Sequence, residues 1–129
     1  WEERATDAVI REVDDASGAP LERLTRLFRL TASADGRLER AIRHWAAQDD
    51  AARAAQSRVD ERRIAYVAAL FEALGFSAED ARTRAQLAYL SLIGHYAMNA
   101  GPDKSTALSV SLDAVLGLLT SGQQEPLPG

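Results

Sequence analysis

The sequence contains no cysteine among its 129 residues. Disulfide bonds and thiolate-zinc sites are therefore excluded, and nothing indicates an oxidising compartment, so we expect a cytoplasmic protein. No apolar run approaches the roughly 20 residues that cross a bilayer, and no signal-peptide pattern is present. Because the chain begins with Trp1 rather than methionine, we expect that it is part of a longer protein.

The sequence also lacks the motifs that carry common chemistries. There is no Gly-x-Ser-x-Gly, no phosphate-binding glycine loop and no His-x₃-His or His-Glu-x-x-His spacing around the two histidines, His44 and His95. The carboxylates fall at helix starts and on polar faces, where capping explains them. We therefore predict no catalytic residue, no metal and no cofactor. His95 lies in an apolar helix and suits either a hydrogen-bonded core or interface position or a polar contact in a ligand pocket.

A clustered basic surface is absent as well. The 15 basic and 19 acidic residues give a formal net charge of −4, with both signs mixed along the chain. Arg23, Arg26 and Arg29 recur on one helix, but their surroundings are not strongly basic. We expect this chain to bind neither DNA on its own nor a membrane.

Alanine is common and strand-forming residues are sparse, which predicts an all-α fold in one domain over residues 1–121, with a flexible tail at 122–129. Apolar periodicity and turn residues predict six helices. Their expected bounds are 1–15, 20–31, 37–47, 49 or 50–74, 77–100 and 104–121.

The chain is organised around residues 49–100, a pair of long helices joined at Leu74-Gly75-Phe76-Ser77. Asp49 or Asp50 suits the N-cap of the first helix. Gly75 suits its end, with Phe76 folding back onto Phe71. The second helix, from Ala85 to Met98, is apolar almost all round, so both of its sides need cover.

We therefore predict a homodimer in which the last two helices of each chain form a four-helix interface around a two-fold axis. Gly94 in the helix interior favours close approach by another helix, because glycine there costs about 1 kcal/mol relative to alanine. The predicted interface residues are Leu87, Leu90, Gly94, Ala97, Leu108, Leu112, Val115, Leu116 and Leu119.

Several segments together resemble the effector-binding and dimerisation half of TetR-family transcriptional regulators. They are Arg43-His44-Trp45-Ala46, Asp49, Ala52-Arg53, Val59-Asp60, Arg63-Ile64, Tyr66-Val67, Leu70-Phe71, Ala73-Leu74-Gly75, Ala85, Leu87, Ala88-Tyr89 and Leu92-Ile93-Gly94. The resemblance covers residues 41–97 well and the flanking helices loosely.

The resemblance implies a six-helix bundle that binds a small-molecule effector between helices and dimerises through its last two long helices. It also implies an N-terminal helix-turn-helix that binds operator DNA, commonly as a repressor. That domain is missing from this sequence, and residues 1–15 would be the end of the helix that connects to it.

A pocket between the first, second, fourth and fifth helices would be mainly apolar, with tyrosine hydroxyls as its polar groups. The predicted ligand-binding residues are Phe28, Trp45, Arg63, Tyr66, Leu70, Tyr89 and Tyr96. Each aromatic residue also suits ordinary core packing. Arg63 suits an acidic ligand, or a salt bridge to Asp49, Asp60 or a neighbouring helix. The alternative function is a helical interaction or structural module that senses no small molecule.

Overall fold

A computed structural model describes residues 2–15, 18–33, 36–98 and 112–122, and within these ranges the chain forms six helices and no strand. This confirms the predicted all-α fold. The helices are α1 (Glu2–Asp15), α2 (Pro20–Ser33), α3 (Arg37–Ala46), α4 (Asp50–Ala73), α5 (Ala78–Met98) and α6 (Leu112–Thr120). None of the helices in the described ranges is long and apolar enough to cross a membrane.

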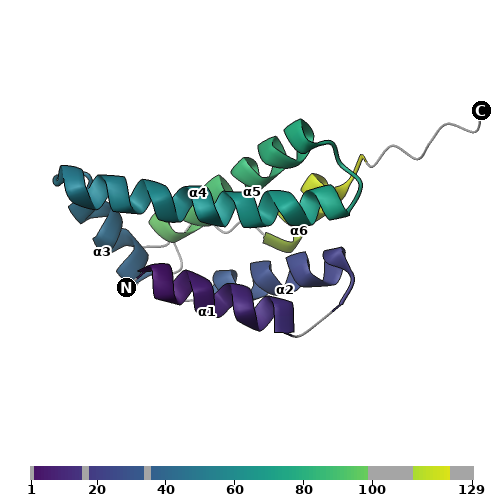
Figure 1. Ribbon diagram of the computed structural model, residues 1–129, viewed down its shortest axis with the longest axis horizontal. Helices are drawn as coiled ribbons and strands as arrows, with labels where there is room; N and C mark the ends of the chain where they lie inside the picture. Colours follow the sequence, from purple (N-terminus) through teal and green to yellow (C-terminus); the bar gives the residue numbers. More distant parts are fainter. Residues whose placement is uncertain (1, 16–17, 34–35, 99–111, 123–129) are drawn as a thin grey trace, which may run out of the picture.

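Helices α4 and α5 form a long antiparallel hairpin whose ends follow the predicted local signals (Figure 1). The Asp49 side chain caps α4 by accepting a hydrogen bond of 2.9 Å from the Ala52 amide. Gly75 has a φ of 106°, a left-handed backbone conformation that residues other than glycine rarely adopt. The Phe76 ring then packs edge-on against Phe71, with ring centroids 5.9 Å apart.

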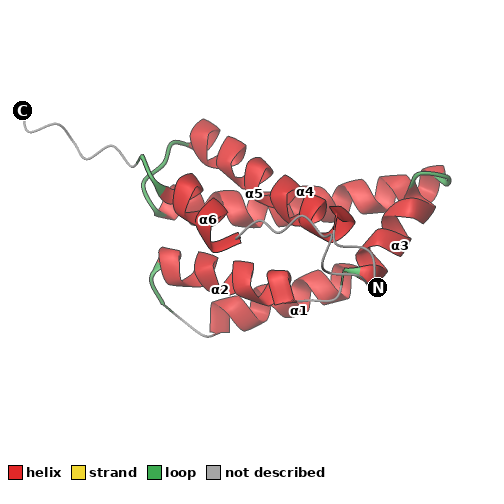
Figure 2. Ribbon diagram, turned by 180° about the vertical axis from the view of Figure 1, so that it is seen from behind, coloured by secondary structure: helices red, strands yellow, loops and turns green. Residues whose placement is uncertain are grey.

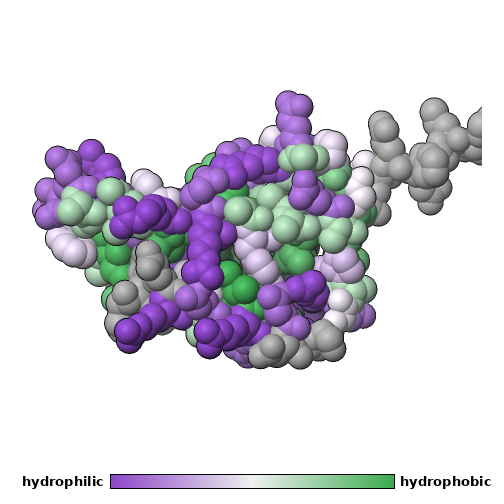
Figure 3. Space-filling view, viewed as in Figure 1, coloured by the Kyte–Doolittle hydropathy of each residue, from purple (hydrophilic) through white to green (hydrophobic). Residues whose placement is uncertain are grey.

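Helices α1 and α2 form a second antiparallel hairpin, which lies against α4 (Figure 1). Figure 2, seen from behind, shows α6 next to α5 and α2. The core lies between these elements and is closed by the fully buried side chains of Val13, Leu24 and Phe71. Polar residues cover much of the surface seen in Figure 3, and apolar residues are visible between them.

The position of α6 corrects the predicted interface. Leu116 belongs to the buried core, and Leu112 and Leu119 pack against it. The strongest apolar face of the helix therefore covers the protein's own core between α2 and α5. The exposed side of α6 carries Leu118, which is 74% exposed. Val115 is half-buried, and the predicted interface residue Leu108, like the rest of segment 104–111, lies outside the described residues.

Helix α3 follows its apolar pattern only in part. Leu38, Ala41, Ile42 and Trp45 recur at the spacing of one helix face, which predicts burial. Only Ile42 is half-buried, and the other three are exposed. Its inward side instead carries the charged residues Glu39 and Arg43, which contact α4 and α5. This orientation brings charges into the interior of the bundle.

Candidate ligand-binding cavity

A cavity of about 260 Å³ lies between five of the six described helices. Residues of α1, α2, α4 and α5 line it, as the sequence predicted, and α3 adds Leu38 and Glu39. Most of the wall is apolar. The apolar lining residues are Val9, Ile10, Leu27, Phe28, Leu38, Val67, Ala88, Leu92 and Ile93.

Five of the seven residues predicted to bind a ligand line this cavity, namely Phe28, Arg63, Tyr66, Tyr89 and Tyr96. All three tyrosines of the sequence are among them. Two predicted residues lie elsewhere. Trp45 is 59% exposed on the outer side of α3, because the inner side of that helix is occupied by charged residues. Leu70 is 3% exposed and belongs to the hydrophobic core one turn beyond Tyr66.

Arg63 organises the polar part of the cavity wall. Its Nε donates to the Thr6 hydroxyl over 3.0 Å, and its Nη1 donates to Glu39 over 3.1 Å and to the Tyr89 hydroxyl over 3.0 Å. These contacts join α1, α3, α4 and α5. Of the predicted alternatives for Arg63, the structure therefore shows a salt bridge to a neighbouring helix.

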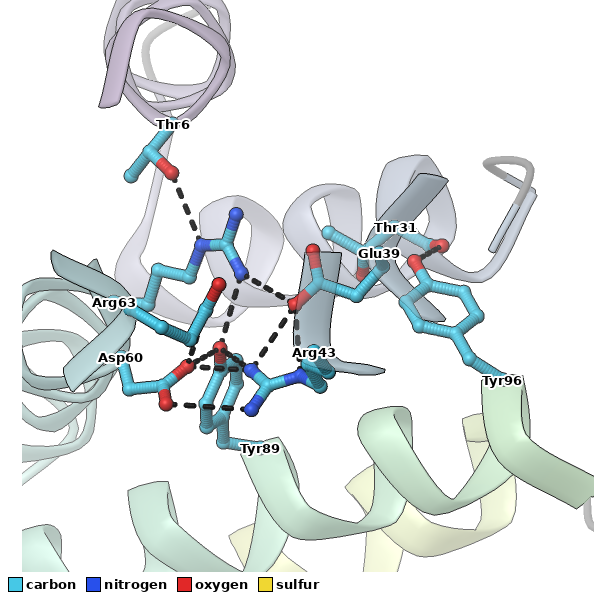
Figure 4. A network of polar contacts seen from close by, with 9 residues as sticks. Thr6, Thr31, Glu39, Arg43, Asp60, Arg63, Tyr89 and Tyr96 are labelled. Atoms are coloured by element: carbon cyan, nitrogen blue, oxygen red, sulfur yellow. Dashed lines mark hydrogen bonds and ion pairs between the residues drawn. The ribbon is translucent and has the colours of Figure 1, made fainter. Parts of the chain in front are cut away.

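A second arginine shares the same partners (Figure 4). Arg43 Nε donates to Glu39 over 3.1 Å, and Arg43 Nη2 donates to the Tyr89 hydroxyl over 2.8 Å. Arg43 also forms an ion pair with Asp60, which accepts a hydrogen bond from the Tyr89 hydroxyl. Gln56 donates to the same carboxylate over 3.1 Å. The result is a polar cluster, defined here as Glu39, Arg43, Asp60, Arg63 and Tyr89.

The protonation states in this cluster follow from its contacts. Burial and the hydrogen bond to Asp60 raise the pKa of Tyr89 above its usual range. Burial alone would raise the pKa of Asp60, but the hydrogen bonds from Arg43 and Tyr89 outweigh it and lower that pKa. Burial likewise opposes the charge on Arg43, yet the hydrogen bond to Asp60 and the nearby negative charges of Asp60 and Glu39 together outweigh it and raise the arginine pKa. At neutral pH Tyr89 is therefore an uncharged donor between charged groups.

The other two tyrosines bind elements at different parts of the cavity. The Tyr96 hydroxyl donates to the Thr31 carbonyl on α2, and burial raises the pKa of Tyr96 to about 12. A Cβ at Gly36 would lie 2.7 Å from the Tyr96 ring, so this ring packs directly on the start of α3. The Tyr66 hydroxyl donates to Asp14 on α1 over 2.8 Å.

Sequence reasoning missed the partners of Arg63 and Tyr89, namely Thr6, Glu39 and Arg43, and did not connect Asp60 with Tyr89. One signal was present: Glu39 and Arg43 are four residues apart, the spacing at which a carboxylate and an arginine pair on one helix face. That spacing is usual on solvated faces too, so it does not reveal that the pair points inward.

The histidines do not contribute to this cavity. His44 is exposed, and its Nε2 lies 3.5 Å from Gln48 Nε2. His95 is half-buried, with its ring centroid 6.2 Å from that of Tyr96. In the part of the chain that the structure describes, no group of three or more histidine, aspartate or glutamate side chains is placed to hold a metal ion.

Comparisons of the chain with protein-family models, curated proteins and solved structures gave no significant match. The interpretation of the cavity therefore depends on its geometry and on the sequence resemblance.

Proposed function

We propose that the chain is the effector-binding and dimerisation domain of a TetR-like transcriptional regulator, with DNA binding carried by a helix-turn-helix domain outside this sequence. The main support is the largely apolar cavity of about 260 Å³, which Glu39, Arg63 and Tyr89 of the polar cluster help to line. Concave apolar sites with a few converging polar groups are typical of small-molecule binding. Repression is the expected mode, because it is the commoner behaviour in the family.

The cavity is connected to α1, which in this proposal leads to the DNA-binding domain. Two cavity-lining side chains on α4 bind α1 directly: Arg63 through Thr6 and Tyr66 through Asp14. A ligand that forms hydrogen bonds with Arg63 or Tyr66 would compete with these contacts. It would thereby favour a different orientation of α1, provided that it binds one orientation better than the other.

The proposed homodimer uses the outer faces of α5 and α6. Leu90 is 65% exposed, and Leu87 and Met98 are also exposed on α5. A Cβ built at Gly94 would meet no atom of the described residues within 4 Å, so the glycine leaves room for another helix at that place. In this proposal a second copy would cover these residues and the exposed Leu118 on α6.

A ligand screen tests the sensing proposal. Uncharged and charged small molecules are tested for an increase in Tm, and each hit is repeated on Leu92→Trp, which places an indole in the cavity. Leu21→Trp is the matched control, because Leu21 is exposed and does not line the cavity. We expect hits that survive in the control and are lost in Leu92→Trp. Hits that bind both variants equally would show that the cavity is not the ligand site.

Light scattering after size-exclusion chromatography tests the dimer. We expect the mass of two chains at micromolar concentration, a shift to one chain in Leu90→Asp and no shift in the control Leu21→Asp. A wild-type monomer would refute the homodimer. If the protein is a dimer but the screen finds no ligand, the alternative is favoured, namely a helical interaction module that senses no small molecule.

The coding sequence upstream of Trp1 tests the regulatory assignment. The proposal requires a preceding segment with a helix-turn-helix pattern and basic residues. An unrelated upstream segment would refute it, whatever the cavity binds.

A further inference from the structure

The charge balance of the polar cluster indicates which ligands the cavity accepts. Among the described residues, the cluster contains two arginines and two carboxylates, and each arginine contacts at least one of these carboxylates. The only tyrosine in the cluster is uncharged at neutral pH. The wall therefore has no net charge that a ligand would need to neutralise.

Glu39 is the residue that opposes an anionic ligand. It lines the cavity, its side chain is 14% exposed, and it accepts from both Arg43 and Arg63. Arg63 is the arginine that lines the cavity, and it is bound to Glu39. A carboxylate that approached Arg63 would therefore lie beside the Glu39 carboxylate, where the repulsion is weakly screened.

A cationic ligand meets the opposite obstacle. Its head would lie near the guanidinium of Arg63, which also lines the cavity and pairs with Glu39 over 3.1 Å. Displacing Arg63 from Glu39 would also break its hydrogen bonds to Thr6 and Tyr89. A ligand charge of either sign therefore lies beside a like charge of the Glu39–Arg63 pair, and the opposite charge of that pair is already neutralised.

An uncharged head group faces neither obstacle. A hydroxyl can donate to the carboxylate of Glu39 or to the oxygen of Tyr96 and accept from Arg63, and a carbonyl can accept from Arg63. Figure 4 shows Glu39 between Arg63 on one side and Tyr96 on the other. The apolar residues of α1, α2 and α5 then surround the rest of the molecule.

We propose that the ligand of this cavity is an uncharged, mainly apolar molecule with one hydroxyl or carbonyl head held by Glu39 and Arg63. This inference rests on the proposed function, because it specifies the effector class of the same cavity. An apolar cavity of about 150 Å³ binds benzene, so a volume of about 260 Å³ suits roughly ten to fifteen non-hydrogen atoms.

Two sets of molecules, each with a common apolar part and an uncharged, an anionic or a cationic head group, test the proposal. One set is naphthylmethanol, naphthoate and naphthylmethylammonium, and the other is octanol, octanoate and octylammonium. Binding is measured by isothermal titration calorimetry at neutral pH, on the whole chain and on Leu92→Trp. We expect at least one alcohol to bind about tenfold more tightly than its charged counterparts, and to be lost in Leu92→Trp.

Glu39→Gln tests the stated cause. It keeps the size of the side chain and its acceptor oxygen but removes the charge. We expect the affinity for the carboxylate to rise about tenfold relative to the alcohol. Glu72→Gln is the control, because Glu72 is exposed on α4 and does not line the cavity, and we expect no change in selectivity. Circular dichroism checks that both variants are folded. The comparison of ligands on the wild-type chain tests the ligand class even if a variant does not fold.

The outcomes separate this inference from the proposed function. If a carboxylate or an ammonium ion binds the wild-type cavity best, the cavity is a ligand site but the uncharged class is wrong. Unchanged selectivity in a folded Glu39→Gln variant would refute the role of Glu39. If no molecule of either set binds, both the ligand class and the sensing function are contradicted.

Discussion

Replacing Tyr89 with phenylalanine is the sharpest test of the polar cluster. The hydroxyl donates to Asp60 and accepts from Arg43 and Arg63, at 2.8 Å and 3.0 Å respectively. The ring itself is buried in α5, and phenylalanine preserves it. The substitution therefore removes three hydrogen bonds to charged groups while leaving the packing in place.

The expected cost is smaller than three full hydrogen bonds. Each hydrogen bond to a charged group contributes about 1.5–3 kcal/mol. However, both arginines keep the carboxylate of Glu39, and Asp60 keeps Arg43 and Gln56. None of the three charges is left without a partner, so we expect a loss of about 2 kcal/mol in the free energy of unfolding. For a domain of this size that is a fall of roughly 6–10 °C in Tm.

Urea unfolding followed by circular dichroism, at one fixed protein concentration, measures this loss. Tyr66→Phe is the matched control, because its hydroxyl donates to Asp14, which is exposed. Water can replace that contact, so we expect the control to lose less than about 1 kcal/mol. If Tyr89→Phe were as stable as Tyr66→Phe, Tyr89 would not connect the two arginines and the cluster would have to be described differently.

Three further predictions concern pH and glycine. Burial raises the pKa of Tyr96 to about 12 and also raises that of Tyr89, so the stabilisation from these tyrosines is complete below pH ~10 and is lost as pH rises towards 12. An absorbance titration of tyrosinate should therefore show that less than half of the tyrosine is ionised at pH ~10. Ionisation of half or more would contradict the buried hydroxyls. The pKa of Asp60 is lowered in the folded protein, so the stability that Asp60 contributes is present above its unfolded pKa of about 4 and is lost as pH falls through its folded pKa. Asp60→Asn should therefore make the urea midpoint less dependent on pH in the acid range. An unchanged pH dependence would contradict this. Gly75→Ala should lower the free energy of unfolding by about 1–2 kcal/mol, because Gly75 has a positive φ. Gly94→Ala should stabilise an isolated chain by up to about 1 kcal/mol and weaken a dimer that uses Gly94. If urea unfolding of the monomer showed Gly75→Ala to be more stable than Gly94→Ala, the backbone argument would be refuted.

The central hairpin was predictable because its signals are local. The cap at Asp49 and the turn at Gly75 depend on a few neighbouring residues and on backbone geometry. The contact of Phe76 with Phe71 follows from the same turn. Helix type and most boundaries within the described ranges could thus be obtained without knowing which helices are neighbours in space.

The facing of α6 was not predictable in the same way. Its apolar face, with Leu112, Leu116 and Leu119, suits a dimer interface as well as a core. Periodicity shows that a face needs cover but not which surface covers it. The choice depends on the gap between α2 and α5, which exists only once the other helices are assembled.

The facing of α3 shows a different limit, and it bears directly on the candidate site. Periodicity assumes that charged residues meet water, because burying an unpaired charge is costly. Glu39 and Arg43 are charged but not unpaired, since Asp60, Arg63 and Tyr89 on two other helices neutralise and hydrogen-bond them. Burial of such pairs adds little stability compared with apolar packing, so stability alone gives no reason to turn Trp45 outward. A ligand that needs a neutral, hydrogen-bonding wall gives such a reason, and the selectivity of Glu39→Gln measures it.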